Sequence, residues 1–408
     1  MPDAVIVSTV RTPIGRAAKG SLTQVRPDDM AATVIRAALD RVPALDPATV
    51  EDVVLGCAQP AGSQGWNLAR FVSDLAGMGH VPGVTVNRYC SSSLQAIRMC
   101  AHAIRAGEGD VFVAAGVETV SQYGLGMADG GGETLNPRMR PARERSRERS
   151  AGGAPEWTPF DGDIADYDIA MGQTAENVAQ LEGVSRQEQD EFAARSQQRA
   201  TAARDRGFFE REIVPLDTVD ADGNPVTVHH DDGIRPGTTA ERLAELKPVF
   251  RPDGTVTAGN ACPLNDGAAA VIVMSDRRAS ELGLTPLARI ISSGVSALDP
   301  EIMGLGPVEA CRQAMARAGM TIDDIDLVEI NEAFAAQVVP SARHLGISWD
   351  QLNVNGGAIA VGHPFGMTGA RIMTTLLNAL DDTDRTIGME SMCVGGGQGM
   401  AMIVERLS

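Results

Sequence analysis

The chain has 408 residues, 43% of them hydrophobic, and at about 150 residues per domain this length predicts two or three domains with large buried cores. Its 35 basic and 53 acidic side chains give a net charge of 35 − 53 = −18, and so acidic a surface repels the phosphates of nucleic acids and anionic lipids. The six cysteines form no CxxC pair, so we expect free thiols in a reducing compartment.

The two ends of the sequence and its apolar runs bear on location. Residues 1–15 lack the basic and then long apolar pattern of a secretory signal, and no apolar run reaches the roughly 20 residues of a membrane helix. The last residues, Glu-Arg-Leu-Ser, differ from the peroxisomal signal Ser-Lys-Leu. We therefore expect a cytoplasmic protein without membrane insertion.

Short β-branched runs alternate with longer Ala-rich stretches along the chain. The strand-like residues 5–7 precede a helix-like stretch at 28–42, and the strand-like residues 53–55 precede another strand at 84–87. This alternation predicts an α/β fold with a mainly parallel sheet covered by helices.

The N-terminal pattern recurs near the C-terminus. Strand-like runs at 51–56 and 84–87 (VTVN) lead into a helix-like stretch, and runs at 326–330 and 352–355 (LNVN) lead into another at 368–380. We therefore expect two similar α/β halves related by a pseudo-twofold axis.

The segment between the halves has a different composition. It contains a glycine run at 130–132, an arginine-rich run at 138–149, helix-like stretches at 170–181 and 185–206, and a polar, loop-like stretch at 217–239. We expect a loop domain (residues 121–251) inserted between an N-terminal half (1–120 with 252–275) and a C-terminal half (276–408). The six arginines of the 138–149 run form either a solvated loop or a patch for a polyanionic ligand such as a nucleotide phosphate tail.

Two cysteines follow strand-like runs. Cys90 opens a helix-like stretch at 91–105, where the helix dipole lowers a thiol pKa and free amides can stabilise an oxyanion. Cys393 precedes the run VGGGQG, whose glycines let the backbone approach a ligand closely. Each also has a structural interpretation, Cys90 as a small buried side chain and Cys393 as part of a tight turn before the strand-like residues 400–404.

A histidine and an asparagine complete the set of candidates. His363 lies in a glycine-flanked loop before a helix, where an imidazole serves as a base or is simply structural. Asn331 ends a strand, and by default it is the N-cap of a helix at 333–345, with Glu332 complementing the dipole. Like Cys90 and Cys393, both follow strand ends, where the sites of open α/β folds gather. A thiol nucleophile, an imidazole base, a second thiol and glycine amides fit acyl transfer.

A series of motifs along almost the whole chain resembles the thiolase family of acetyl-CoA acyltransferases and acetyltransferases. In the order of the family they are VNRYCSSSLQA (86–96), MGQTAEN (171–177), TAGN (257–260) with LNDGA (264–268), NEAFA (331–335), NVNGG (353–357), GHPFGMTGA (362–370) and CVGGG (393–397). The resemblance implies two similar α/β halves in a five-layered αβαβα sandwich, with the loop domain binding coenzyme A.

The resemblance also implies a role for each candidate. Cys90 is the acylated nucleophile, His363 activates it, and Cys393 exchanges a proton with the α-carbon of the substrate. Asn331 holds a water that, with His363, polarises the thioester oxygen. The amides of Cys90 and Gly395 form a second oxyanion hole.

Further residues match the substrate-binding positions of the family. Arg235 corresponds to an arginine that packs on the adenine of CoA, and the residues that line the pantetheine and acyl pocket are Met171, Met303, Phe334 and its neighbour Ala333. CoA is a co-substrate, and no metal or redox cofactor is implied. The family implies a homodimer that pairs N-terminal halves or a homotetramer, with other β-oxidation enzymes as further partners.

Two positions depart from the family pattern. Cys262 stands where the family usually has Ser near the CoA thiol, and a thiol is the weaker hydrogen-bond donor. Ala170 replaces the His of the His-Met-Gly motif of short-chain biosynthetic members. With the stretches DGIRPGTT and PEIMGLGP, this favours the degradative members, which cleave 3-ketoacyl-CoA with CoA. The alternative is a short-chain acetoacetyl-CoA thiolase working biosynthetically.

Two other functions share the fold. The first is that of ketoacyl synthases or hydroxymethylglutaryl-CoA synthases. Ketoacyl synthases pair their cysteine with two histidines or with a His and an Asn, but of the six histidines here only His363 lies in a matching motif, and Cys393 has no role in that scheme. A non-catalytic acyl-CoA-binding subunit is marked by the loss of Cys90, His363 or Cys393, and all three are present.

Overall fold

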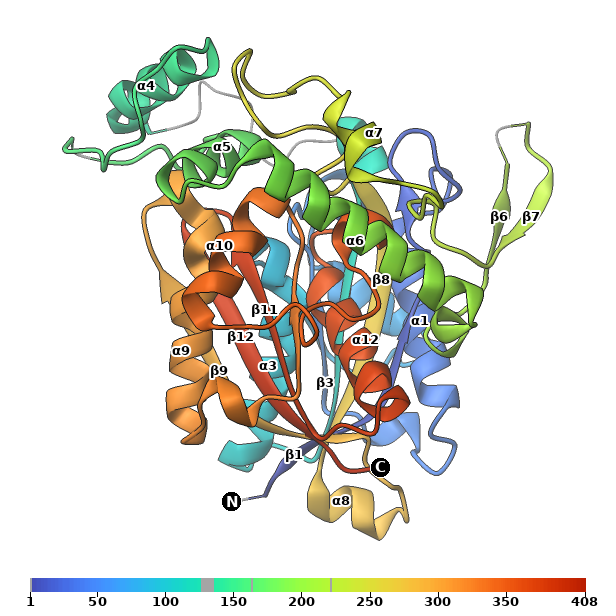
Figure 1. Ribbon diagram of the computed structural model, residues 1–408. Coiled ribbons are helices and arrows are strands. Elements are labelled where there is room, and N and C mark those ends of the chain that lie inside the picture. Colours follow the sequence, from blue (N-terminus) through green and yellow to red (C-terminus); the bar gives the residue numbers. More distant parts are fainter. Residues whose placement is uncertain (1, 126–135, 163, 221) are drawn as a thin grey trace.

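The computed structural model describes residues 2–125, 136–162, 164–220 and 222–408 (Figure 1). The glycine run at 130–132 lies outside the described residues. Within the described part of the chain, no helix is long and apolar enough to cross a bilayer.

Strands from both halves join in one ten-stranded sheet, in the order β10-β11-β12-β9-β1-β8-β5-β3-β4, with β2 on β8. The strands are β1 (Ala4–Arg11), β2 (Gly15–Arg16), β3 (Asp52–Gly56), β4 (Gly83–Val86), β5 (Val111–Thr119), β8 (Asn265–Ser275), β9 (Ala288–Ala297), β10 (Leu327–Ile330), β11 (Ile387–Val394) and β12 (Gln398–Arg406). The two halves meet where β1 and β9 pair at Val5 with Arg289 and Ile6 with Ala288.

The expected duplication is confirmed by strand order. In the N-terminal half β3 pairs in parallel with β5, and β8 runs antiparallel between β5 and β1. In the C-terminal half β10 pairs in parallel with β11, and β12 runs antiparallel between β11 and β9. The expectation of a mainly parallel sheet is wrong, because β8 and β12 each insert antiparallel between two neighbours.

The strand expected at 352–355 does not form, so that prediction is also wrong. Only Leu352 bridges to the sheet, at Val328. Asn353 adopts a left-handed φ of 46°, and its side-chain amide bonds both the N–H and the carbonyl of Ile330, at 2.9 and 3.0 Å. A side chain therefore replaces the backbone pairing that a strand would have supplied.

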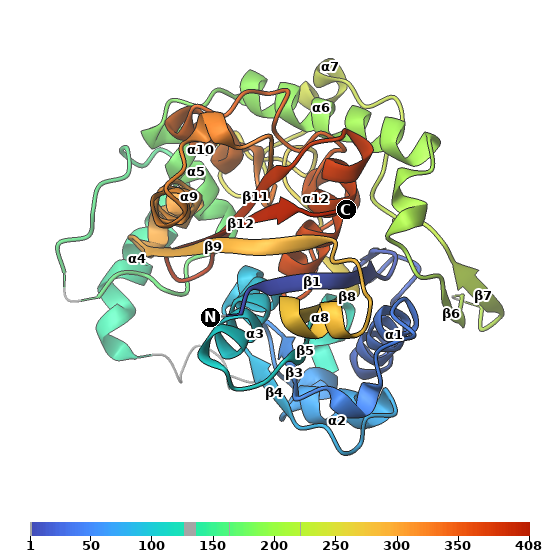
Figure 2. The ribbon, with the colours of Figure 1, turned by 90° about the horizontal axis from the view of Figure 1, so that it is seen from below.

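Helices complete five layers, as expected. They are α1 (Pro27–Asp40) and α2 (Leu68–Leu75) outside the N-terminal strands, α3 (Ser92–Ala106) and α12 (Thr368–Asp382) between the halves, α9 (Gly306–Ala318) and α10 (Ala335–Leu345) outside the C-terminal strands, and the short α8 (Asp276–Glu281) and α11 (Ala358–Val361). Figure 2 shows the C-terminal half, in orange and red, above the N-terminal half, in blue. Separate hydrophobic cores fill the central and the two outer interfaces.

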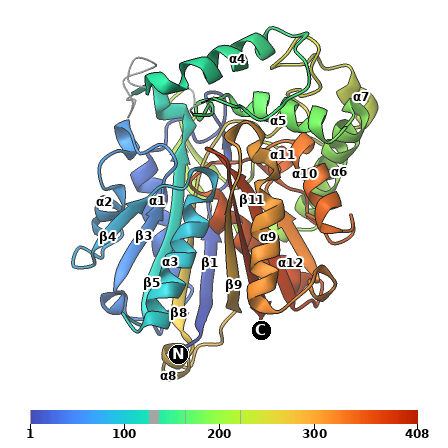
Figure 3. The same cartoon turned by 90° about the vertical axis from the view of Figure 1, so that its left-hand side faces the viewer.

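The loop domain covers one end of the sheet, at the top of Figure 3. Its elements are α4 (Arg140–Ser150), α5 (Met171–Leu181), α6 (Arg186–Asp205), α7 (Ala240–Ala244) and the hairpin of β6 (Leu216–Val219) and β7 (Pro225–Val228). The polar stretch at 217–239 therefore contains a hairpin where the sequence suggested only loop. The domain boundaries themselves stay a prediction.

The arginine-rich run is a helix, not a solvated loop. Within α4, Arg145 forms an ion pair with Glu301, and Arg149 donates to the carbonyl of Pro155 at 3.1 Å. Arg145 thus fastens α4 to a residue outside the loop domain, whereas Arg149 holds the chain that directly follows α4. That the run binds a polyanion stays a prediction.

Candidate active site

Cys90 lies in a short 3₁₀ turn, η3 (Tyr89–Ser91), directly before α3. Tyr89 has a left-handed φ of 45°, which is unusual for a bulky residue, and its N–H donates to Asn87 Oδ1 at 2.8 Å. The backbone therefore turns sharply after β4. The turn packs against β11 and α12, the elements next to the other candidates.

The Cys90 sulfur accepts hydrogen bonds from the backbone N–H groups of Cys90 and Gly395. These donors favour the thiolate, but burial outweighs them, and with the Glu118 charge it raises the pKa of Cys90 to about 12. The expected lowering of this pKa by a helix N-terminus is therefore wrong. The thiol is protonated at neutral pH, so a nucleophilic role requires a base.

His363 is buried in the loop before α12, and its neighbours fix its tautomer. The Thr368 hydroxyl donates to the carbonyl of Pro364 at 2.7 Å, so it accepts from the His363 Nδ1–H at 2.6 Å. The lone pair is therefore on Nε2, which accepts from Asn331 Nδ2 at 3.2 Å. Burial, aided by the Arg371 charge, lowers the pKa of His363 to about 3, so the imidazole is a neutral acceptor.

Asn331 follows β10 and is not a helix N-cap. Its N–H donates to the carbonyl of Ser391 at 2.9 Å, and the chain stays extended to Phe334, which precedes α10. A bridge between Phe334 and Ala261 holds this extended segment and delays the helix. The Asn331 side chain is thus free to face His363, and its Oδ1 has no hydrogen-bond partner among the described residues.

Cys393 is buried near the end of β11, and Cys262 is its neighbour. The charge of Cys90 raises the pKa of both Cys393 and Cys262, in addition to the larger effect of burial, and Cys262 also raises that of Cys393. The three sulfurs therefore lie within electrostatic reach of one another. Cys90 and Cys262 keep some solvent exposure, whereas Cys393 has none.

The glycine loop (residues 395–397) follows Cys393. Gly396 and Gly397 have φ values of 74° and 75°, a region that favours glycine. A Cβ on Gly397 would lie 2.2 Å from the carbonyl oxygen of Leu298. This backbone conformation presents the Gly395 N–H to Cys90, and it is not open to larger residues.

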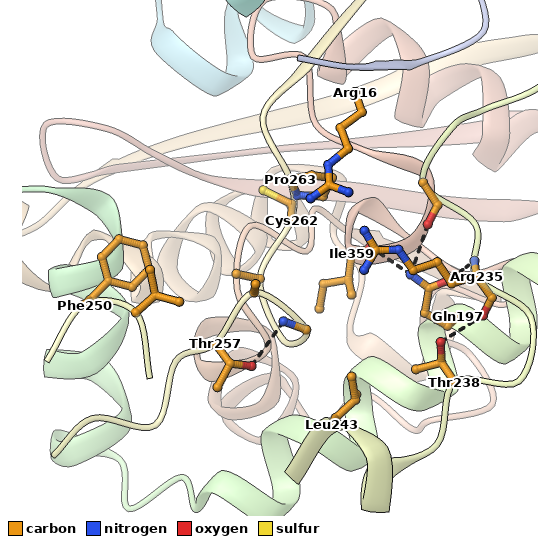
Figure 4. A pocket seen from close by; sticks show the side chains of 15 residues that line it. Arg16, Gln197, Arg235, Thr238, Leu243, Phe250, Thr257, Cys262, Pro263 and Ile359 are labelled. Carbon is orange, nitrogen blue, oxygen red and sulfur yellow. Dashed lines mark hydrogen bonds between the residues drawn. The ribbon is translucent and has the colours of Figure 1, made fainter. Parts of the chain in front are cut away.

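A pocket of about 740 Å³, including space open to solvent, reaches the site from the loop domain (Figure 4). Arg16, Arg235, Cys262 and Phe250 are among the residues that line it, and Figure 4 shows Arg16 beside Cys262 and Arg235 beside Gln197. The backbone N–H of Arg235 donates to Gln197 Oε1 at 2.8 Å. The pocket therefore connects two cations with a sulfur adjacent to Cys90.

The proposed acyl-pocket residues gather on one side of the site. Met303, Ala333 and Phe334 share a hydrophobic cluster with Cys393, and Met171 packs against it. The Phe250 ring lies edge-on to Phe334 with 6.1 Å between the ring centres. Three of the predicted residues thus share a core with the second thiol, and Met171 borders that core; that they line an acyl pocket stays a prediction.

Sequence reasoning missed several residues of the site. No local sequence pattern marks Arg16 or Phe250 as a residue of the site. Glu118 is a buried carboxylate in β5 that accepts from the N–H groups of Ala58 and Gly366 at 2.9 and 2.8 Å. It thereby fastens the His363 loop to the N-terminal half, and the only signal was an acidic residue inside an apolar strand.

Comparison with known proteins agrees with this arrangement. Residues 4–277 match the family described as thiolase, N-terminal domain, and residues 284–406 match thiolase, C-terminal domain. Proteins named 3-ketoacyl-CoA thiolase from Aeromonas hydrophila and Idiomarina loihiensis are 46% and 44% identical over 412 aligned positions, and each alignment covers 100% of both chains.

Two solved structures are similar along the full length. Human mitochondrial 3-ketoacyl-CoA thiolase has a TM-score of 0.86 at 36% identity, and the acetyl-CoA acetyltransferase of Bacillus anthracis has a TM-score of 0.85 at 38% identity. Each comparison covers 100% of this chain and 99% of the other. With both domain matches and full-length relatives, the chain belongs to the thiolase family.

Proposed function

We propose that the protein is a 3-ketoacyl-CoA thiolase, an acyltransferase that uses CoA to cleave a 3-ketoacyl-CoA into acetyl-CoA and a shortened acyl-CoA. The observation that carries this is the placement of Cys90 within electrostatic reach of Cys393 and near the Gly395 amide, in a chain similar over its full length to proteins of that name. Glu118, whose charge acts on the Cys90 thiol, also binds the loop that carries His363. The enzyme acts in the degradation of fatty acids or related acyl chains, in the cytoplasm.

The first half reaction forms an acyl enzyme. The Cys90 thiol gives its proton to His363 Nε2 as the sulfur attacks the 3-keto carbon, and the amides of Cys90 and Gly395 bind the developing oxyanion. The bond between C2 and C3 then breaks, and its electrons form the enolate of acetyl-CoA. Cys393 protonates the enolate carbon and becomes a thiolate, while the acyl group stays on Cys90.

The second half reaction returns the enzyme to its starting state. The thiol of free CoA gives its proton to the Cys393 thiolate and attacks the acyl group. The Cys90 sulfur leaves and recovers its proton from His363. Cys90, His363 and Cys393 thus recover their starting protonation states, and the kinetic mechanism is ping-pong.

The unequal acidities of Cys90 and His363 shape the first step. A thiol with a pKa of about 12 beside an imidazole with a pKa of about 3 keeps its proton in the free enzyme. The transfer becomes favourable only as negative charge moves from sulfur to the oxygen that the amides bind. The resting site therefore avoids a reactive thiolate.

The pocket between Arg235 and Cys262 has the chemistry to hold CoA, as co-substrate and as part of the substrate. Its two arginines suit the phosphates and adenine of the nucleotide end, and apolar lining residues such as Leu243 and Ile359 suit pantetheine. Cys262, whose backbone N–H donates to the carbonyl of Ala333 at 3.0 Å, also lines the pocket.

A biosynthetic acetoacetyl-CoA thiolase is the second candidate, since the bacterial acetyl-CoA acetyltransferase is as similar in structure as the human thiolase. Turnover of 3-ketoacyl-CoA substrates from four to sixteen carbons with free CoA separates the two. We expect kcat/KM to rise beyond the four-carbon substrate. Activity confined to acetoacetyl-CoA would assign the biosynthetic function, and no cleavage of any substrate would refute both.

The edge of the N-terminal half is suited to a dimer. Strand β4 ends the sheet, and exposed apolar side chains surround it, with Trp66 91%, Phe71 59% and Val84 36% exposed. We expect a twofold dimer in solution, or a tetramer made of two such dimers. Light scattering should show that Phe71→Glu with Val84→Lys gives monomers, whereas Leu407→Glu, which removes an exposed leucine elsewhere, leaves the assembly unchanged. A monomeric wild-type protein would contradict this.

A further inference from the structure

Arg88 lies between β4 and Cys90, and the reaction described above does not use it. Its guanidinium donates from Nη1 to Gln398 Oε1 at 2.8 Å and from Nε to Gln95 Oε1 at 3.0 Å. Among the described residues, no carboxylate forms an ion pair with Arg88. An arginine that holds two amide side chains is suited to orienting them, because its planar fork fixes direction.

The orientation of Gln398 follows from this bond. Since the guanidinium only donates, it holds the Gln398 oxygen, and Gln398 Nε2 must face the other way. There it donates to the carbonyl oxygen of Gly395 at 3.3 Å. Gly395 is thus held at its carbonyl, which belongs to the peptide after its Cα, while its N–H, in the peptide before its Cα, lies near the Cys90 sulfur.

The glycine loop is the tight turn of the β11–β12 hairpin, where Val394 pairs with Gln398 and the Gly397 carbonyl accepts from the Leu298 N–H at 2.8 Å. Its residues have no side chains, and Gly396 and Gly397 have left-handed φ values. The Tyr89 ring packs beside it, 3.3 Å from where a Cβ on Gly395 would lie. Arg88 belongs to the N-terminal half and Gln398 begins β12 of the C-terminal half, so the bond between them also fixes the two halves relative to each other at the site.

We infer that Arg88 is a positioning residue, which acts through Gln398 to keep the Gly395 amide directed at the sulfur of Cys90 and at the oxyanion that forms there. The inference rests on the proposed function for its effect on turnover. The effect on the thiol itself is independent of any substrate.

The competing interpretation is that Arg88 only anchors α3 through Gln95. Four variants separate the two: Arg88→Met, Gln398→Met, the double variant, and Gln95→Met as the matched control that removes the other partner of the same guanidinium. Arg88→Lys, which keeps one donor, serves as the rescue. Thermal unfolding checks that each variant is folded.

The first readout is the rate at which iodoacetamide alkylates Cys90 at pH 8, followed by peptide mass mapping. Loss of the Gly395 hydrogen bond raises the thiol pKa and slows alkylation. We expect Arg88→Met and Gln398→Met to be slower than the wild type by a similar factor of several-fold, and Gln95→Met to be unchanged. Because Gln398→Met does not alter charge, an effect of that variant does not arise from loss of the Arg88 cation.

The second readout is thiolysis. We expect kcat to fall about 10- to 100-fold in Arg88→Met and in Gln398→Met, with KM little changed. This fall is smaller than the one caused by complete removal of an oxyanion-hole donor, because the Gly395 N–H is misdirected but still present. The double variant should be no worse than either single one, because both break the same chain of bonds, and Arg88→Lys should recover most of kcat.

Normal alkylation and kcat in Gln398→Met, additive losses in the double variant, or an equal loss in Gln95→Met would each overturn the inference. If the wild type cleaves no 3-ketoacyl-CoA, the proposed function fails, and the alkylation rates still decide the role of Arg88.

Discussion

Replacing Cys393 by alanine is expected to abolish exchange of the methyl protons of acetyl-CoA with deuterated water and to slow thiolysis by ~10²–10⁴-fold. Cys393 is buried beside Cys90 and Cys262, where its thiol can give a proton to an enolate carbon and take it back. The same variant should still transfer an acyl group between Cys90 and free CoA, because thioester exchange forms no carbanion. The two half reactions should therefore separate in this variant.

The measurement is methyl deuteration by mass spectrometry alongside exchange of labelled CoA into acyl-CoA. Cys100→Ala is a matched control, because Cys100 is also a buried thiol but lies ten residues after Cys90 in α3, where the charge that acts on it is that of Asp52 at the start of β3. It should leave both rates near those of the wild type. If Cys393→Ala kept normal deuteration, Cys393 would be a packing residue, and Cys262 would become the candidate acid.

The His363→Ala variant is expected to lose both half reactions, by ~10²–10⁴-fold each. The imidazole Nε2 faces Asn331. In the proposed mechanism it accepts the Cys90 proton, so its loss should affect acylation and enolate formation together. Thr368→Val, which removes the hydroxyl that fixes the tautomer, should lower both rates by a smaller factor. Equal rates in His363→Ala and the wild type would assign the proton of Cys90 to another base.

The pH dependence of the wild type gives a second check on His363. Burial lowers the pKa of His363 to about 3, so its neutral, functional form is fully present at pH 7 and is lost only as the pH falls through that value. Acylation should therefore show no acid limb near pH 6.5, the ordinary value for histidine. A limb at 6.5 that disappears in His363→Ala would show that the imidazole titrates freely.

Much of the architecture follows from patterns that are local in the sequence. The duplicated strand and helix pattern predicts the two halves, and Cys90 after β4 and Cys393 near the end of β11 agree with the expectation of sites at strand ends. His363 instead follows α11, because the strand expected at 352–355 does not form. The expected parallel direction was wrong at β8, which the long loop domain separates from its neighbour β5, so that no local pattern encodes their pairing. At β12 the glycines at 395–397 form a tight hairpin turn after β11, a local signal for antiparallel pairing that the expectation did not use.

The errors at the site have a common physical cause, which is tertiary contact. Cys90 follows a strand as expected, but burial raises its pKa and outweighs its amide donors. Asn331 is not a cap, because the Phe334 bridge to Ala261 keeps the chain extended. The role of Arg88 depends on Gln398, a partner 310 residues away in the sequence.

The central claim is that Cys90 carries the acyl group. Mixing the enzyme with a 3-ketoacyl-CoA in the absence of free CoA, quenching with acid and mapping the peptides by mass tests it directly. The account predicts an acyl group, shorter than the substrate by the two carbons of acetyl-CoA, on the peptide that contains Cys90, and its removal when CoA is added. An acyl group on Cys262 or Cys393, or none on any cysteine while acetyl-CoA is released, would contradict it.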